Sequence, residues 1–204
     1  MPRIAFFSPL PPARSGIADY SETLLAELKR LAEVDVFTEH PGPSFAPERY
    51  DALLYQMGNN GYHVFTYELA LKHPGIVVMH ESNLHHLITE ITIKRNDWDA
   101  YVREVEYDGG PAALAFAERV RALEVGPDYE GVSMLRRLLE RSRGAIAHSE
   151  FVAENLRQAG LQAPVAIIPH GAWMPPAPDR MGARHKLGLV AHTPLIGIFG
   201  FLNP

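Results

Sequence analysis

Short apolar runs separated by longer amphipathic segments are the feature that most constrains the fold of this sequence. The runs are rich in Ile, Val, Phe and Ala and lack a regular alternation of polar and apolar residues. That pattern is typical of strands covered on both faces, as in a parallel sheet. Because strands and helices alternate, we expect an α/β fold with a doubly wound parallel sheet. The predicted strands are Arg3–Ser8, Glu33–Phe37, Ala52–Met57, Gly75–His80, Gly144–Ser149, Pro164–Pro169 and Leu195–Gly200.

Two of the intervening segments have helical patterns. Apolar side chains recur every three or four residues from Ile17 to Leu31, which places them on one face of a helix. The segment Phe151–Ala159 is expected to form a second helix that ends near Gly160, because glycine is common just after a helix. Ser149 precedes this segment and suits its N-cap position.

A long segment without strand character interrupts this alternation. More than sixty residues lie between His80 and Gly144, too many for one crossover helix. Ala112–Val125 and Val132–Arg143 both have helical patterns, and the turn-forming sequence Asp108–Pro111 breaks the segment. We therefore predict a helical insertion at about 89–143, packed beside the sheet. It could cover the core, act as a substrate lid or form an oligomer contact.

A Pro-rich stretch at 173–179 predicts a stiff connector. We divide the chain into an amino-terminal Rossmann-like domain at 1–172, an interdomain linker at 173–192 and a final segment at 193–204. A short helical piece is expected at Arg184–Leu189. The final segment is expected to hold the first strand of a second, carboxyl-terminal domain whose remainder is missing from this chain.

The composition excludes several classes of function. The chain has 204 residues, 47% of them hydrophobic, and a net charge of −5, which is typical of a globular protein and gives no basic field for nucleic acid. Without cysteine there can be no disulfide, thiolate nucleophile or Cys-ligated metal. No apolar run approaches the ~20 residues that span a bilayer, and no signal peptide is visible. We expect a cytoplasmic protein, with membrane association not indicated.

The loop after the first predicted strand leads into a helix through Ser15 and Gly16. Backbone N–H groups at such a helix start can bind a phosphate, and glycine allows close approach of a ligand. Alternatively, Ser15 simply caps the helix. Neither the GxGxxG nor the GxxxxGK[ST] signature occurs, which argues against a dinucleotide site or a P-loop.

Polar residues also follow the third and fourth predicted strands. The adjacent amides Asn59 and Asn60 suit a polyhydroxylated ligand, because each amide both donates and accepts, although Asn and Gly also dominate turns. His80 ends the fourth strand, either as a substrate contact or as a hydrogen-bonded strand-end residue. No metal site is expected, since the HExxH spacing is absent, and His85 and His86 are expected to begin the next helix.

Five motifs along the chain together resemble a known family. In order and spacing they look like the amino-terminal half of a GT-B glycosyltransferase, and more narrowly like the retaining enzymes of glycosyltransferase family 4. The resemblance covers nearly the whole chain and is weakest across the insertion. The motifs are Ser15-Gly-Ile-Ala-Asp-Tyr-Ser21, Gly58-Asn-Asn-Gly-Tyr-His63, Val78-Met-His-Glu81, Ala147-His-Ser-Glu150 and Ile168-Pro-His-Gly171.

The resemblance implies two Rossmann-like domains that face each other across a cleft. The first holds the acceptor, and the second holds a nucleotide-diphosphate sugar whose sugar passes to an acceptor hydroxyl, without a metal. Retention is attributed in this family to a front-face reaction without a protein nucleophile. On this resemblance His80 contacts the transferred sugar, Ser15, Gly16 and Gly200 lie near the donor diphosphate, and Asn59, Asn60, His63 and Glu81 line the acceptor side.

The sequence also departs from the family's pattern. The donor site of the family has two Glu residues separated by seven others, and no pair of Glu residues here has that spacing. Phe201 stands where many members have Arg or Lys, and the loop before Ile17 has one Gly where many have two. We therefore expect no catalysis by this chain alone. The alternatives are a GT-B nucleotide-sugar epimerase and a non-enzymatic Rossmann-like module that binds a sugar or a protein.

Overall fold

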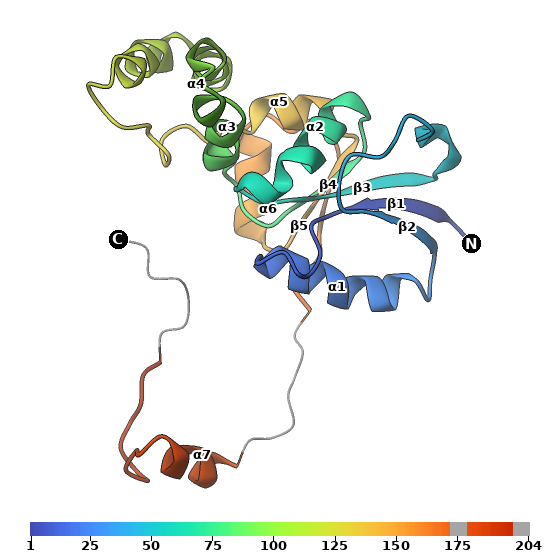
Figure 1. Ribbon diagram of the computed structural model, residues 1–204, viewed down its shortest axis with the longest axis vertical. Coiled ribbons are helices and arrows are strands. Elements are labelled where there is room, and N and C mark those ends of the chain that lie inside the picture. Colours follow the sequence, from blue (N-terminus) through green and yellow to red (C-terminus); the bar gives the residue numbers. More distant parts are fainter. Residues whose placement is uncertain (172–178, 198–204) are drawn as a thin grey trace. The chain divides into compact units, whose positions relative to one another are not determined.

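Six parallel strands form one sheet in the order β2-β1-β3-β4-β5-β6 (Figure 1). The computed structural model describes residues 1–171 and 179–197. The all-parallel sheet with helices between its strands confirms the predicted α/β class. The strands are β1 Arg3–Phe7, β2 Glu33–Phe37, β3 Ala52–Met57, β4 Ile76–Met79, β5 Gly144–Ala147 and β6 Val165–Ile167.

The register of the central strands aligns three aromatic rings. Phe7 of β1 is paired with Phe37 of β2 and with Tyr55 of β3. Its ring stacks on both neighbours, with centroid distances of 4.9 and 4.7 Å. Phe7 and Tyr55 have no exposed surface, so this row forms a central part of the core.

Helices cover the two faces of the sheet unequally. Helix α1 (Gly16–Leu28) lies on one face, whereas α2 (Val64–Lys72) and α5 (Arg136–Arg141) lie on the other (Figure 1). The main apolar cluster lies on the side of α2 and α5. It includes Met57, Tyr67, Met79, Leu138 and Leu139, each at most 2% exposed.

The segment between β4 and β5 contains α3 (His85–Ile91), α4 (Trp98–Arg121) and α5. Helix α4 begins well before the predicted Ala112, because the Asp97 side chain accepts from Ala100 N and caps an earlier turn. The predicted break at Asp108–Pro111 is a kink, with Gly110 at φ 72°.

The 3₁₀ helices of the described chain are η1 Pro47–Arg49, η2 Gly61–His63 and η3 Ile93–Arg95.

The chain divides into two units, Met1–Pro169 and His170–Pro204. The second unit contains α7 (Arg180–Lys186), which begins earlier than the predicted Arg184 because the Asp179 side chain accepts from Gly182 N at 3.0 Å. Residues 195–197 of the strand predicted at Leu195–Gly200 are not in a strand, and its other three residues, Gly200 included, lie outside the described residues.

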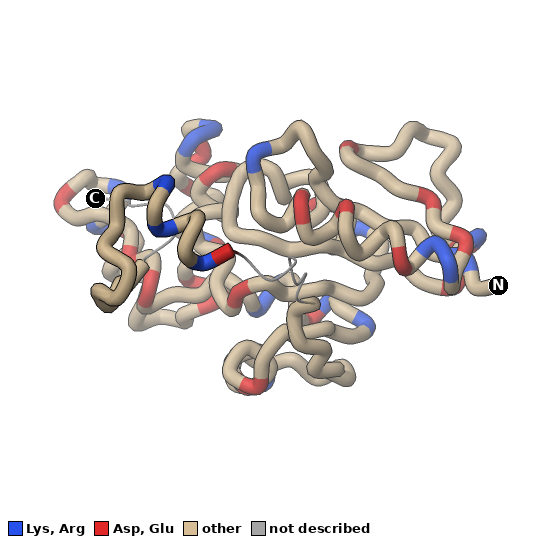
Figure 2. The backbone as a smooth tube through the Cα atoms, turned by 90° about the horizontal axis from the view of Figure 1, so that it is seen from below, with Lys and Arg blue, Asp and Glu red and all other residues tan. Residues whose placement is uncertain are grey.

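In the first unit, α6 (Glu150–Gln158) joins β5 to β6. Ser149 is its N-cap, as predicted, and its Oγ accepts from Val152 N at 3.2 Å. No helix in the described ranges has the length and apolar character that crossing a bilayer requires. Figure 2 shows basic and acidic residues interspersed along the tube rather than gathered by sign.

Candidate functional site

The strand order defines where a ligand is expected to bind. Strand β1 lies between β2 and β3, so the connections leave it in opposite directions across the sheet. In open α/β sheets, ligands bind at such a switch point, outside the carboxyl ends of the strands. The loops at 8–15 and 58–60 follow β1 and β3 at this edge, and the residues after β4 and β5 come next along it.

Ser15 and Gly16 form the start of α1 at the switch point. Ser15 is extended, and its Oγ accepts from Ile17 N at 3.3 Å, so it caps the helix. Gly16 is exposed, and apart from its chain neighbours and the backbone of its own helix no described heavy atom lies within 4 Å of a Cβ built there. The backbone at the start of α1 is therefore open to a ligand on this side. Phosphate binding at this helix start stays a prediction.

His80 lies directly beyond β4 and is partly buried. Its Nε2 is 2.8 Å from Oε1 of Gln56, the penultimate residue of β3. The ring of Tyr20, from α1, meets the His80 ring edge-on, at a centroid distance of 4.8 Å and an angle of 81°. Contacts from β3 and α1 thus orient the imidazole at the carboxyl edge of the sheet.

A second histidine, His148, lies beside His80. It follows β5, and the centroids of the two rings are 4.8 Å apart. Its Nδ1–H donates to the carbonyl of Ile168 at 2.8 Å. Tyr20 contacts this ring too, at 5.3 Å.

Sequence reasoning did not select Gln56, Tyr20 or His148 as site residues. His148 could have been selected from the sequence, because residues that follow neighbouring parallel strands lie together at the carboxyl edge of the sheet. Gln56 was detectable as a polar residue within an otherwise apolar run. Tyr20 lies within the apolar repeat from Ile17 to Leu31 and within the motif Ser15–Ser21, where nothing in the sequence distinguishes it from a core residue.

Asn59 and Glu81 are brought together after β3 and β4. The backbone N–H of Asn59 donates to Oε1 of Glu81 at 3.0 Å. The Asn59 side chain accepts from Leu87 N at 3.0 Å and donates to Oδ1 of Asn83 at 3.3 Å. Glu81 is exposed as a residue, but the surrounding chain desolvates its carboxyl and raises its pKa, whereas the hydrogen bond from Asn59 N opposes this shift. Their predicted role in acceptor binding stays a prediction.

Asn60 and His63 have structural contacts of their own. Oδ1 of exposed Asn60 accepts from Tyr62 N at 3.0 Å and caps η2. His63 is fully buried, and its Nδ1–H donates to the backbone carbonyl of Gln56 at 3.0 Å. Burial lowers the pKa of His63 to about 4, so the ring is neutral at pH 7. In this conformation the His63 ring does not reach the surface that an acceptor would meet.

His85 and His86 begin α3, as predicted. His85 is 1% exposed, and its Nδ1 and Nε2 contact the Val132 carbonyl and the Tyr101 hydroxyl at 2.8 and 3.1 Å. His86 stacks on the ring of Tyr129, with centroids 4.0 Å apart. Both side chains therefore anchor the inserted segment to α3.

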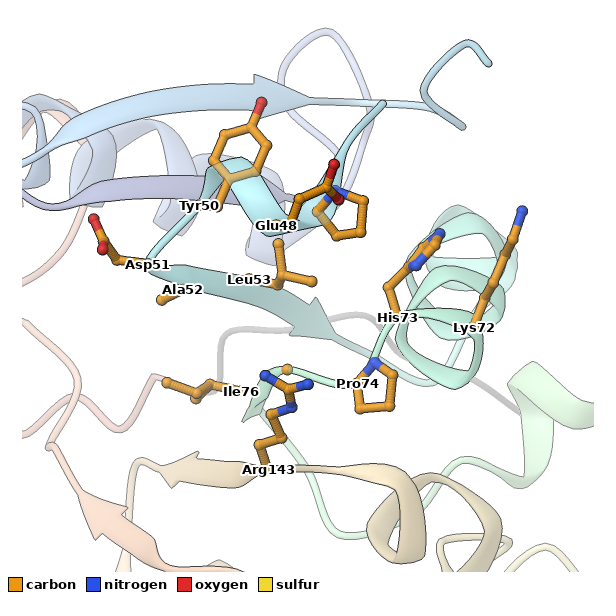
Figure 3. A pocket seen from close by; sticks show the side chains of 12 residues that line it. Glu48, Tyr50, Asp51, Ala52, Leu53, Lys72, His73, Pro74, Ile76 and Arg143 are labelled. Carbon is orange, nitrogen blue, oxygen red and sulfur yellow. The ribbon is translucent and has the colours of Figure 1, made fainter. Parts of the chain in front are cut away.

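A separate cavity of about 540 Å³ lies at the opposite, amino edge of the sheet. It is bordered by Ala52 and Ile76, the first residues of β3 and β4, and by Arg143, which precedes β5 (Figure 3). Lys72 and His73 border it at the end of α2. Because this cavity lies at the opposite ends of the same strands, it is not part of the switch-point site.

Comparison with known proteins gives no assignment. No family model matches the sequence, and no curated protein matches it. The fold and the site define the first unit as a Rossmann-like, doubly wound α/β structure with a polar site at its switch point.

Proposed function

We propose that the first unit is the acceptor-side domain of a retaining glycosyltransferase, which transfers a sugar from a nucleotide-diphosphate sugar to an acceptor hydroxyl. The observation that carries the proposal is that α1, β3 and β4 present Gly16, Asn59 and His80 at one edge of the sheet. Contacts join these elements, because Tyr20 of α1 packs on His80 and a Cβ at Gly58 would lie 2.5 Å from Ile17.

Each of these groups suits one part of the proposed substrates. The exposed start of α1 offers the Gly16 N–H and the positive end of the helix dipole to a diphosphate, because the N–H groups of Ile17 and Ala18 already donate to Ser15. Arg14, exposed in the preceding loop, adds a cation. The imidazole of His80 can form a hydrogen bond with a sugar hydroxyl. Rate enhancement would come from positioning and from stabilisation of the leaving diphosphate.

The test is a transfer assay on the protein expressed from its complete coding sequence, including any codons after Pro204. Labelled nucleotide sugars are offered with a panel of hydroxyl acceptors. His80→Ala is expected to lower kcat by about 10²-fold or more if the ring acts on the transition state. His73→Ala is the matched control, because this histidine borders the cavity at the amino edge.

Two outcomes would contradict the proposal. An unchanged rate in His80→Ala would remove this residue from the site. Epimerised nucleotide sugar formed without any acceptor would favour an epimerase on the same fold, since fold does not fix function.

A further inference from the structure

Gln56 places a buried amide directly behind His80. It is fully buried in β3, where its register partner in β4 is Val78. Oε1 contacts His80 Nε2 at 2.8 Å, whereas Nε2 of the amide has no hydrogen-bond partner among the described residues. The side chain therefore makes one directed contact, and that contact is to the histidine of the candidate site.

Stability does not explain an amide at this position. A buried N–H group without a partner is unfavourable, and an apolar side chain of similar size would remove the penalty. Phe6 and Val78, which are buried on the same face, are apolar. Buried Ser8 beside them is satisfied by a hydrogen bond to Ser21 at 2.7 Å, so this amide differs in leaving an N–H without a partner among the described residues. The contact with His80 is the interaction that an apolar residue would lose.

We propose that Gln56 is a positioning residue that fixes the tautomer of His80. A carbonyl oxygen only accepts, so the nitrogen facing Oε1 must carry the proton. The neutral ring is then held with hydrogen on Nε2, and Nδ1 is its acceptor atom. The catalytic meaning of this inference rests on the proposed function. The tautomer decides which ring nitrogen of His80 can donate to a sugar hydroxyl and which can accept from it.

The surroundings support a single ring orientation. Tyr20 meets the His80 ring at 81°, and His148 lies beside it at 4.8 Å. On the other side, the Nδ1–H of His63 donates to the backbone carbonyl of Gln56 and holds the end of β3. A rotation of the Gln56 amide would expose its N–H groups to His80 and demand the opposite tautomer.

The direct test is ¹⁵N NMR of the histidine side chains in the 204-residue chain. Wild-type His80 is expected to show a protonated Nε2 and an unprotonated Nδ1. Gln56→Leu is expected to convert this signature to a mixture of tautomers. Gln56→Glu retains the acceptor and is expected to retain the tautomer while raising the pKa of His80, because a carboxylate stabilises the charged ring. Gln162→Leu, at an exposed glutamine, is the matched control.

Folding is monitored separately through the melting temperature. Gln56→Leu is expected to melt no lower than the wild type, because it removes an unsatisfied amide. If it fails to fold, Gln56→Met supplies the same test with an unbranched side chain. A wild-type ring protonated on Nδ1, or a tautomer unchanged in the folded apolar variant, would overturn the inference.

Kinetics of the complete protein separate this inference from the proposed function. Gln56→Leu is expected to lower kcat roughly tenfold to a hundredfold, by analogy with the loss of a hydrogen-bond partner that orients a metal-ligating histidine, and Gln56→Glu to restore part of it. If the tautomer changes but kcat does not, the positioning role is wrong. If no transfer occurs in any variant while the NMR result holds, the proposed function fails and the tautomer assignment stands.

Discussion

The side-chain amide of Asn59 holds the first turn of α3, since its Oδ1 accepts the backbone N–H of Leu87 at 3.0 Å. Its Nδ2 donates to Asn83, which in turn accepts from His85 N at 2.8 Å. Asn59, two residues after β3, thus fixes the loop that carries Glu81 after β4. The edge of the sheet that we assign to substrate is held by side-chain hydrogen bonds between loops.

Replacing Asn59 with alanine is expected to lower the free energy of unfolding by about 1–3 kcal/mol, because the Leu87 N–H loses its acceptor. Urea unfolding followed by tryptophan fluorescence measures the change. Asn60→Ala is the control, since this exposed residue caps only a short helix and its loss is expected to cost less, about 0.5–1 kcal/mol. Equal losses in the two variants would contradict the role given to Asn59.

Two glycines at the switch point are expected to respond differently to alanine. A Cβ at Gly58 would lie 2.5 Å from Ile17 Cδ1 and 2.8 Å from Nε2 of buried His63, so Gly58→Ala should destabilise by about 1–3 kcal/mol. A Cβ at Gly16 meets open space, so Gly16→Ala should stay within about 0.5 kcal/mol of the wild type. Thermal unfolding compares the two, and a Gly16 variant that melts much lower would contradict this view of the α1 start.

The carboxylate of Asp108 caps the start of α5 from the kink of α4. It accepts from Met134 N at 2.9 Å and from Arg136 N at 2.8 Å. Asp108→Ala is expected to lower the free energy of unfolding by about 1–2 kcal/mol, the usual effect of losing a cap. Glu106→Ala, at an exposed position on the same helix, should change it by less than about 0.5 kcal/mol. Chemical denaturation of both variants measures these two changes in the free energy of unfolding.

His63 is expected to make stability depend on pH. Its pKa is about 4 in the folded chain, against 6.5 for an exposed histidine, so between these values the unfolded chain binds a proton that the folded chain does not. The free energy of unfolding should therefore fall as the pH falls from about 6.5 to 4, by up to about 3 kcal/mol from this residue. The variant His63→Asn should show a smaller fall in urea titrations at several pH values.

Buried His85 and half-buried His73 act in the same direction. Burial also lowers the pKa of His85 and of His73. The comparison between His63→Asn and the wild type isolates one residue from this common trend. An identical pH dependence in both proteins would show that His63 does not contribute.

Local patterns were sufficient for the elements themselves. Runs such as Ala52–Met57 and the serine caps at Ser15 and Ser149 were predictable, because strand burial patterns and capping depend on residues a few positions apart. The start of α4 at Trp98 was missed, since Asp108–Pro111 has the composition of a break and the structure turns it into a kink.

The sequence by itself determined the parallel α/β class and the placement of His80 at the end of a strand, because both follow from hydrophobic patterning along the chain. Only the tertiary structure decided that Gln56 and His148 flank His80 and that His63 is buried. The order of strands in a sheet and the burial of a side chain depend on contacts between residues far apart in the chain. No local spacing records such contacts, and the packing of the whole unit selects them.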